Sequence, residues 1–334
     1  MDSRARRKVA AILRILDEAG RSLGSTRIAR ELHIQGIELS HRTVRYYLGM
    51  MDEEGLTRSL GKRGRAITPL GEMELRGAMT VEKVGFMVAT VDALAYEMTF
   101  DLEHLRGQVI LNISLIDAAE VKRAASEIMQ VYSAGLGMGK YVALAGAGER
   151  IGNLGVPPGK FAIGTVCSIT INGVLLKAGI VTHSKFGSLL EMRNGQPHRF
   201  TEIINYDGTT IDPLEIFIRG QMTRVARAAS TGNGIVGASF REIPTAGINE
   251  VERINGELER SGLGAALVIG MPNQPVFDVP VGQGRTGMIV MAGLNPLAAV
   301  EEAGIRTTNW AMKTMLDFGQ LVPYEEIQRF ASLS

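Results

Sequence analysis

The chain has 334 residues, 45% hydrophobic and 21% charged, a balance that excludes a disordered protein and fits a soluble globular one. Its single cysteine, Cys167, excludes an intramolecular disulfide framework and a multi-thiolate metal site. We also expect no other metal site and no cofactor. No apolar run approaches the roughly 18 residues of a membrane helix, and the charged N-terminus is unlike a signal peptide; we expect a cytoplasmic protein without a membrane span.

Positive charge is concentrated at the N-terminal end. Residues 1–76 contain 15 Lys and Arg against 10 Asp and Glu, while the remainder contains 21 against 25. A basic end attached to a slightly acidic body is typical of a protein that binds a polyanion through one domain.

The N-terminal residues show the pattern of a helix-turn-helix domain. Apolar residues at spacings of three and four predict a first helix over residues 4–19, ended by Gly20. A second helix is predicted from Ser25. Ser40 is a suitable N-cap for a third helix that continues to about residue 54.

The third helix is predicted to present a basic and aromatic face to solvent. Arg42, Arg45 and Tyr46 share that face, which suits the major groove of DNA. Ser40 and His41 stand at the helix start, where free backbone amides can meet phosphates.

A wing follows the third helix. Residues 56–60 and 66–68 are predicted to form two short strands around a glycine-rich tip that carries Lys62, Arg63 and Arg65. Cations at such a tip can replace the counterions of DNA phosphates. We therefore predict a winged helix that binds operator DNA; the alternative is a winged helix used for protein contacts, with its wing a solvated turn.

The predicted domain boundary lies near residues 77–79. Residues 1–76 would form the DNA-binding domain, and residues 80–330 a second domain that contains an internal repeat. The two copies, residues 137–180 and 262–305, share the order glycine turn, apolar strand, Gly/Pro loop, apolar strand, short helix and glycine stop. The alternative is that two unrelated α/β segments have similar composition.

The helices that close the two copies have recognisable ends. Asn295 is a plausible N-cap with Pro296 at the first helical position, and Thr170 is a weaker cap in the first copy. Gly179 and Gly304 would supply the left-handed residue after each helix.

The repeat extends to the segments that precede each copy. We predict a strand over residues 84–91, a helix over 92–104, a strand over 107–115 and a helix over 118–133, with related segments before the second copy. The halves would form related lobes with a cleft between them, where small molecules bind. The predicted fold class is α/β: a winged helix-turn-helix followed by a duplicated two-lobed α/β effector-sensing domain.

The second domain carries no complete catalytic motif. The GxGxxG at residues 282–287 precedes a predicted strand, whereas a dinucleotide fingerprint precedes a helix. Gly139-Lys140 lacks the other residues of a phosphate-binding loop, and Cys167 has no identifiable base. We expect no catalytic residue and no enzyme; the alternative is a small-molecule enzyme with an accessory nucleic-acid module.

Anion binding is the chemistry that the predicted cleft supports. The two repeat helices begin near Thr170 and Asn295, where free amides favour a carboxylate or phosphate. Three cations lie in apolar or glycine-rich surroundings, although each alone could be part of a structural salt bridge. The candidate effector-binding residues are Thr165, Cys167, Ser168, Lys185, Arg219, Arg241 and Asn295.

Long segments of this chain resemble the archaeal nitrogen repressor family, NrpR. Its regulatory domain is matched by GTVCSITINGVLLKAGI (164–180), FTEIINYDGTTIDPLEIFIRGQMT (200–223), GASFREIP (237–244) and MPNQPV (271–276). The segments SHRTVRYYL and GKRGRAITPLG resemble the ribonuclease R type winged helix that heads those repressors. The resemblance covers nearly the whole chain.

The resemblance implies a dimeric transcription repressor that binds operators near nitrogen-assimilation promoters and releases them when 2-oxoglutarate accumulates. It also implies that Cys167, the cysteine of GTVCS, lines the effector cleft. A homodimer fits two-fold symmetric operators, whereas an RNA-binding protein is the alternative that the type of winged helix suggests. Many family members carry two regulatory domains, and this chain carries one.

Overall fold

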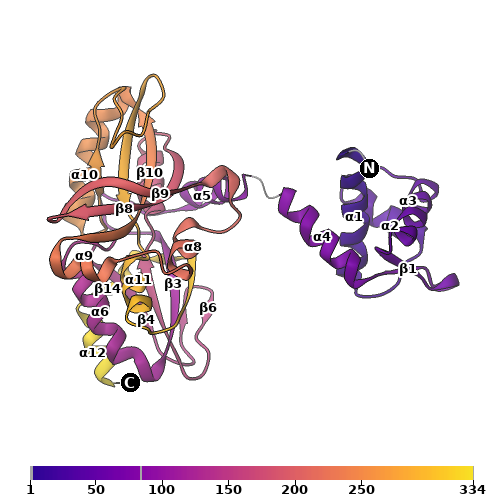
Figure 1. The fold of residues 1–334 in the computed structure, drawn as a ribbon, viewed down its shortest axis with the longest axis horizontal. Helices are drawn as coiled ribbons and strands as arrows, with labels where there is room; N and C mark the ends of the chain where they lie inside the picture. Colours follow the sequence, from indigo (N-terminus) through magenta and orange to yellow (C-terminus); the bar gives the residue numbers. More distant parts are fainter. Residues whose placement is uncertain (1–2, 83–84, 334) are drawn as a thin grey trace. The chain divides into compact units, whose positions relative to one another are not determined.

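The computed structural model describes residues 3–82 and 85–333. The chain divides into two compact units, residues 1–84 and 85–334, which are described separately (Figure 1). None of the helices within the described ranges combines the length and apolar character needed to cross a membrane.

The first unit is a winged helix, as predicted. Its elements are α1 (Ser3–Ala19), α2 (Ser25–Ile34), α3 (His41–Glu53), β1 (Thr57–Ser59), η1 (Gly61–Arg63), β2 (Arg65–Ile67) and α4 (Pro69–Glu82). The amphipathic faces of the helices meet in one core, where Ile12, Leu32 and Leu48 are fully buried. Ser40 caps α3 because its hydroxyl oxygen accepts a hydrogen bond from the Thr43 amide at 3.1 Å. Helix α4 continues through residues 77–79.

One sequence prediction is wrong at the start of the second unit. Instead of a strand over residues 84–91 and a helix over 92–104, one helix, α5 (Phe86–Glu97), occupies the segment; Val84 lies outside the described residues. Met87, Val91 and Ala95 are buried at a spacing of four, which is the period of one helical face. The apolar run was short enough to fit either structure.

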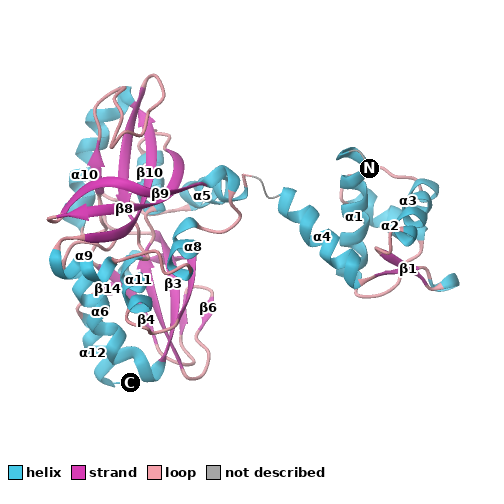
Figure 2. Cartoon of the chain, in the orientation of Figure 1, coloured by secondary structure: helices cyan, strands magenta, loops and turns pink. Residues whose placement is uncertain are grey.

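The second unit contains two five-stranded sheets (Figure 2). The first sheet has the order β13-β3-β7-β4-β14 and the second the order β11-β12-β10-β8-β9. Their strands are β3 (Gln108–Asp117), β4 (Tyr141–Ala145), β7 (Lys160–Val166), β8 (His183–Arg193), β9 (Gln196–Asn205), β10 (Gly234–Pro244), β11 (Ala266–Ile269), β12 (Arg285–Met291), β13 (Thr307–Asp317) and β14 (Val322–Pro323). A small hairpin, β5 (Arg150–Ile151) and β6 (Leu154–Gly155), lies between β4 and β7 in the chain.

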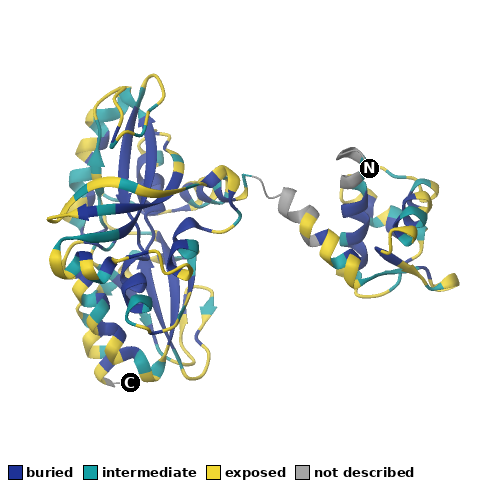
Figure 3. Cartoon of the chain, viewed as in Figure 1, coloured by how far each residue is buried: buried dark blue, intermediate teal, exposed yellow. Residues whose placement is uncertain are grey.

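Helices and short 3-10 turns connect and cover these sheets. The helices are α6 (Val121–Ser133), α7 (Ile169–Lys177), α8 (Pro213–Arg219), α9 (Val225–Thr231), α10 (Ile248–Ser261), α11 (Asn295–Glu302) and α12 (Glu326–Leu333). The 3-10 turn η3 (Tyr206–Gly208) precedes α8. Figure 3 shows the strands of both sheets largely buried and the outer faces of the helices exposed, and β9, an edge strand, carries mostly exposed residues.

The duplicated halves exchange their last strands. Each half runs strand, helix, strand, strand, helix, strand: β3, α6, β4, β7, α7, β8 in the first and β10, α10, β11, β12, α11, β13 in the second. Strand β8, however, pairs with β10 in the second sheet, and β13 pairs with β3 in the first. The two lobes are therefore interlocked, and a separation of one requires movement of strands from both halves.

Matching hydrogen bonds show that the halves are equivalent. In the first half, the Cys167 amide donates to the Ile110 carbonyl oxygen at 2.8 Å, and the Thr170 hydroxyl accepts from the Ile110 amide at 3.3 Å. In the second half, the Ala292 amide donates to the Gly237 carbonyl oxygen at 3.0 Å. Each strand-to-helix turn is thus tied to the neighbouring first strand of its half.

Asn295 repeats the role of Thr170 with more bonds. Its Oδ1 accepts from the Gly237 amide at 2.8 Å, and its Nδ2 donates to the carbonyl oxygens of Gly237 and Leu136. The predicted N-cap role of these two residues is therefore wrong, because Thr170 binds β3, and Asn295 binds β10 and the segment after α6, instead of their own helices.

The predicted helix stops are confirmed. Gly179 and Gly304 follow α7 and α11 with φ angles of 78° and 80°, the left-handed conformation expected after a helix. The repeat in the sequence therefore corresponds to a repeat in the backbone.

Candidate functional sites

Helix α3 presents two free arginines. Arg42 and Arg45 are exposed, and within residues 3–82 and 85–333 neither forms a hydrogen bond or ion pair. Tyr46 is 66% exposed, and its ring meets the edge of Tyr47, which is buried beneath it. This face offers unpaired cations and an aromatic ring to a polyanion.

The two residues predicted to contact DNA at the start of α3 have different surroundings. The Ser40 hydroxyl is hydrogen-bonded both to the Thr43 amide and to the Thr43 hydroxyl, so its first role is structural. His41 is exposed at the first position of the helix.

The wing carries two free cations and one that is held. Lys62 and Arg63 are exposed in η1 without an ion-pair partner in the described part of the chain. Arg65 is held within the domain: its Nε donates to Asp52 Oδ2 at 2.8 Å, and the side chain is half-buried. The other oxygen of Asp52 accepts from the Thr57 hydroxyl at 2.6 Å. Asp52 therefore fastens both wing strands to α3, and Arg65 positions the wing instead of projecting from it.

In the second unit, Arg241 on β10 is fully buried and has no carboxylate partner among the described residues. Its Nη1 donates to the Ser168 carbonyl oxygen at 2.8 Å and to Asn172 Oδ1 at 2.5 Å. Its Nη2 donates to the hydroxyls of Ser168 and Ser239, and its Nε has no hydrogen-bond partner. Burial lowers the pKa of Arg241 to about 10, so the group is still a cation at neutral pH.

The equivalent position in the first half carries no charge. Arg241 lies opposite Met288 in the pairing of β10 with β12, as Ser114 lies opposite Ile163 in the pairing of β3 with β7. The Ser114 hydroxyl donates to Asn309 Oδ1 at 2.6 Å. Of these two equivalent positions, only the one in the second half therefore holds a buried cation.

Three further titratable groups are buried in this region, and two of them, Cys167 and Tyr206, interact with Arg241. Burial raises the pKa of the Cys167 thiol to about 12 and raises the pKa of Tyr206. Burial also raises the pKa of Asp212 to about 7, although a hydrogen bond from the Leu214 amide to its Oδ1 at 2.9 Å opposes the shift. Asp212 is the N-cap of α8, with Pro213 at the start of the helix.

A small cavity of about 20 Å³ lies where the two strand-to-helix turns meet. Such a volume suits one water molecule and is far smaller than an organic dicarboxylate. Ser168, which binds Arg241, forms part of its wall. The cavity is lined by Asn112, Cys167, Ser168, Ile169, Tyr206, Asp212, Leu214, Ala292, Gly293, Leu294 and Ala311.

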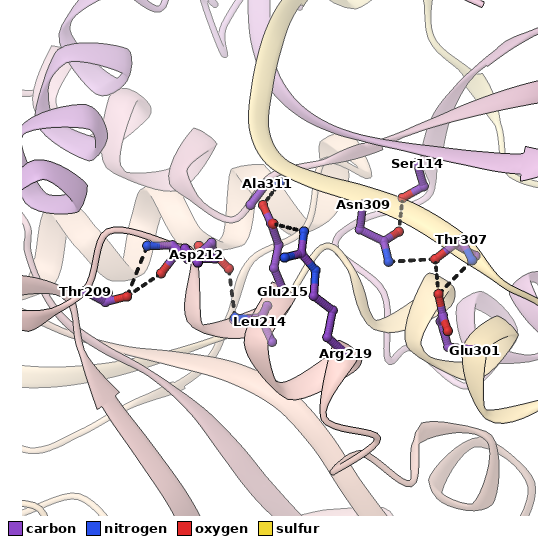
Figure 4. A network of polar contacts seen from close by, with 11 residues as sticks. Ser114, Thr209, Asp212, Leu214, Glu215, Arg219, Glu301, Thr307, Asn309 and Ala311 are labelled. Atoms are coloured by element: carbon purple, nitrogen blue, oxygen red, sulfur yellow. Dashed lines mark hydrogen bonds and ion pairs between the residues drawn. The ribbon is translucent and has the colours of Figure 1, made fainter. Parts of the chain in front are cut away.

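A bulge in β13 shapes one side of this cavity. The register with β3 shifts between Trp310 and Thr314, and Met312 has a φ of 50°, which is unusual for a residue with a side chain. The bulged backbone is held by two polar side chains: the Ala311 amide donates to Glu215 at 2.8 Å and the Met312 amide to Asn112 at 3.1 Å. Figure 4 shows Glu215 reaching Ala311 from helix α8.

Two of the predicted effector cations lie elsewhere. Arg219 is exposed and pairs with Glu215 one turn away on α8, at 3.3 Å (Figure 4). Lys185 is half-exposed and lies 4.0 Å from Glu242. It lines a separate cavity of about 500 Å³ that is bounded by α5 and the segment after α7. Neither cation lines the small cavity, and Arg241 is connected to it only through its bonds to Ser168.

Two predicted polar residues are already satisfied. The Thr165 hydroxyl accepts from Asn112 Nδ2 at 3.2 Å, and the Asn295 amide group is fully engaged with backbone groups. The structure therefore brings together Cys167, Ser168 and Arg241, and it adds Asn112, Tyr206 and Asp212, which the sequence did not single out. The described residues contain no group of three or more His, Cys, Asp or Glu that could hold a metal ion.

Two family models match this chain, and the boundary between them agrees with the division of the structure into two units. Residues 84–322 match the model of the NrpR regulatory domains NRD1 and 2, and residues 10–75 match that of the ribonuclease R winged-helix domain.

Three curated proteins are similar over most of this chain. The global nitrogen regulator NrpRI of Methanosarcina mazei is 34% identical over 95% of this chain and 98% of its own length. The global nitrogen regulators NrpR of Methanococcus maripaludis and Methanocaldococcus jannaschii are 30% and 31% identical, and the chain spans about half the length (51%) of each.

A solved structure supports the fold alone. A nitrogen repressor-like protein from Methanococcus jannaschii superposes with a TM-score of 0.60 over 71% of this chain and 98% of that chain, at 24% identity. Because one family model covers most of the chain and a relative of equal length is 34% identical, the chain belongs to the NrpR family, with one winged helix and one NrpR regulatory domain.

Proposed function

We propose that this protein is a cytoplasmic, homodimeric repressor of nitrogen-assimilation genes, and that 2-oxoglutarate or a close dicarboxylate releases it from operator DNA. The observation that carries the effector part is Arg241, a fully buried guanidinium bonded only to neutral oxygens. The DNA-binding part is supported by the free cations of α3 and η1 and by the names of the relatives.

A buried cation without a counter-charge is costly. Removing an ion from water costs several kcal/mol even after the protein relaxes, and neutral hydrogen bonds recover only part of that cost. A carboxylate is the natural partner, since charge-assisted, bidentate bonds to arginine are roughly twice as strong as neutral ones. Arg241 therefore favours an anionic ligand over its present partners.

The small size of the cavity would couple effector binding to a change of conformation. A cavity of about 20 Å³ cannot hold a dicarboxylate, so the effector enters only when the β7-α7 turn and the β12-α11 turn separate. Its carboxylate would then replace Ser168 and Asn172 on Arg241. The ligand thus binds one conformation better than the other, which is the condition for shifting an equilibrium.

The release of DNA would follow from dimer geometry. In a dimer, two winged helices bind half-sites about 34 to 36 Å apart. If a change in the regulatory domains alters this spacing, only one winged helix can bind its half-site at a time. We place the dimer interface in the regulatory domain, residues 80–330, and the DNA contacts in residues 1–76.

Genome-wide binding in cells grown with scarce and abundant ammonium tests this function. We expect occupancy upstream of nitrogen-assimilation genes with abundant ammonium and loss of that occupancy when ammonium is scarce. Equal occupancy in both conditions would contradict the proposed regulation. Occupancy only inside genes unrelated to nitrogen assimilation would contradict it as well.

A further inference from the structure

We propose that Asp212 is a specificity-determining residue of the effector site: it binds the effector as a protonated carboxyl group, so that effector binding takes up one proton. This inference rests on the proposed function, because it concerns the same site and the same class of ligand.

The geometry places Asp212 at the ligand. The residue is buried and lines the small cavity together with Ser168, the residue that Arg241 holds. Its Oδ1 accepts from the Leu214 amide, and it has no ion-pair partner among the described residues. The buried carboxylate thus borders the cavity itself, while the buried cation is bonded to Ser168 in the cavity wall, and the two do not pair with each other.

The charges around Asp212 are few. From the η3 turn it is faced by Tyr206 and from the β7-α7 turn by Cys167, and neither group is a cation. The cation Arg241 of β10 interacts with these same two groups. On its own helix Glu215 is the nearest carboxylate, and that group is paired with Arg219. On β13 the wall is Ala311, which is apolar; Lys313 of the same strand is exposed and lies over the Trp310 ring.

Charge balance then requires a proton. A dicarboxylate brings two negative charges to a site with one cation, and an ionised Asp212 would add a third negative charge in a place where unpaired charges are expensive. A protonated Asp212 removes that repulsion and gives the site an O–H donor. A keto dicarboxylate has no donor of its own at neutral pH, so it can bind Asp212 only as an acceptor.

The proton on Asp212 would also let the site discriminate between related ligands. An amino acid with the same carbon skeleton carries an ammonium group, which an ionised Asp212 would bind as a charged pair and a protonated Asp212 only as a weaker, neutral acceptor. Protonation of Asp212 therefore selects the keto acid against the amino acid. Burial, which already raises the pKa of Asp212 to about 7, makes this protonation accessible near neutral pH.

This charge balance determines whether affinity for the effector rises or falls with pH. The anionic ligand favours the protonated carboxyl, so the pKa of Asp212 is higher in the complex than in the free protein. Affinity for 2-oxoglutarate should then fall by about tenfold per pH unit above pH 7 and level off below it, because one proton is linked to binding.

Calorimetry of the full chain with 2-oxoglutarate between pH 6 and pH 8.5, repeated in buffers of different ionisation enthalpy, tests the proposal. We expect the wild-type protein to take up close to one proton at about pH 8. The Asp212→Asn variant keeps the acceptor for the Leu214 amide and a donor for the ligand, and its affinity should be nearly independent of pH. Asp117→Asn is the matched control, since it makes the same substitution at an exposed carboxylate that pairs with Lys160 and does not line the cavity, and it should leave the pH slope unchanged.

The experiment distinguishes a failure of this inference from a failure of the proposed function. Binding by the wild type without proton uptake, or an unchanged pH slope in Asp212→Asn, overturns the role of Asp212 and leaves the proposed function standing. No binding of 2-oxoglutarate by the wild type at any pH overturns the proposed effector and this inference with it. Should Asp212→Asn fail to fold, proton uptake by the wild type decides the question alone.

Discussion

Arg241 binds both the carbonyl oxygen and the hydroxyl of Ser168, each at 2.8 Å, and so joins β10 of the second sheet to the turn after β7 of the first. All four acceptors around this guanidinium are neutral. In the proposed function, these four bonds are the ones that an incoming carboxylate would replace. In the proposed mechanism, ligand recognition and opening of the cleft are one event.

We expect the reactivity of Cys167 to report this opening. The thiol is buried and its pKa is raised to about 12, so very little reactive thiolate exists at neutral pH. We expect alkylation by iodoacetamide to be at least about a hundredfold slower in the native chain than in the unfolded chain, and to become faster when 2-oxoglutarate is added. Intact-mass measurement of the labelling rate checks this. Fast labelling without effector would mean that the cleft is already open.

The two pseudo-equivalent anchors should differ in their effect on stability. Asn295→Ala removes the partner of the Gly237 amide and that of the Leu136 carbonyl oxygen, while the Gly237 carbonyl oxygen keeps its bond from the Ala292 amide; each buried orphan costs about 1 to 3 kcal/mol. Thr170→Val removes only two long bonds to Ile110 and should cost roughly 1 to 2 kcal/mol. Urea denaturation of both variants gives the order, and equal losses would contradict the account of these turns.

The wing residues should separate by role. Replacing Lys62 and Arg63 with Ala should weaken binding to every duplex and lower the salt dependence by about 0.9 in log-log slope for each phosphate that the protein no longer neutralises. Arg65→Ala should instead lower the free energy of unfolding by about 1 kcal/mol, because it frees Asp52. Fluorescence anisotropy against salt, together with thermal melting, distinguishes them. A larger salt-slope change for Arg65→Ala than for the tip cations would reverse our assignment.

Helix α3 should carry sequence discrimination. Arg42→Ala or Arg45→Ala should reduce the preference for operator over random DNA by about 1 to 3 kcal/mol if the replaced arginine forms a bidentate pair with guanine. Gel-shift competition measures the preference directly. If both variants and the wing variants bind DNA like the wild type, the winged helix is a protein-interaction module.

The winged helix was predictable because its information is local. Amphipathic spacing, the Ser40 cap and the glycine-rich wing tip each act within a few residues, and all three are present in the structure. The glycine stops at Gly179 and Gly304 were predictable for the same reason. The exchange of β8 and β13 was not, because an apolar strand carries no mark of the sheet that it joins.

The candidate site was only partly predictable. Arg219 and Arg241 both follow apolar residues in the sequence, yet Arg219 lies on the exposed face of a helix with Glu215 one turn away, while Arg241 points into the protein from a central strand. The Asp212-Pro213 pair is a visible helix start, but its burial depends on segments distant in the chain. Tertiary packing, not local pattern, decides which polar side chains meet.

The most direct test compares two arginine variants. Calorimetry of the full chain should show one 2-oxoglutarate bound per chain, because Ser114 replaces the arginine in the equivalent half. Arg241→Met should reduce the affinity by at least about a hundredfold, consistent with the loss of a buried charge-assisted pair, while the exposed Arg219→Met should bind like the wild type. No binding by the wild type, or equal affinity in Arg241→Met, would contradict an effector site at Arg241.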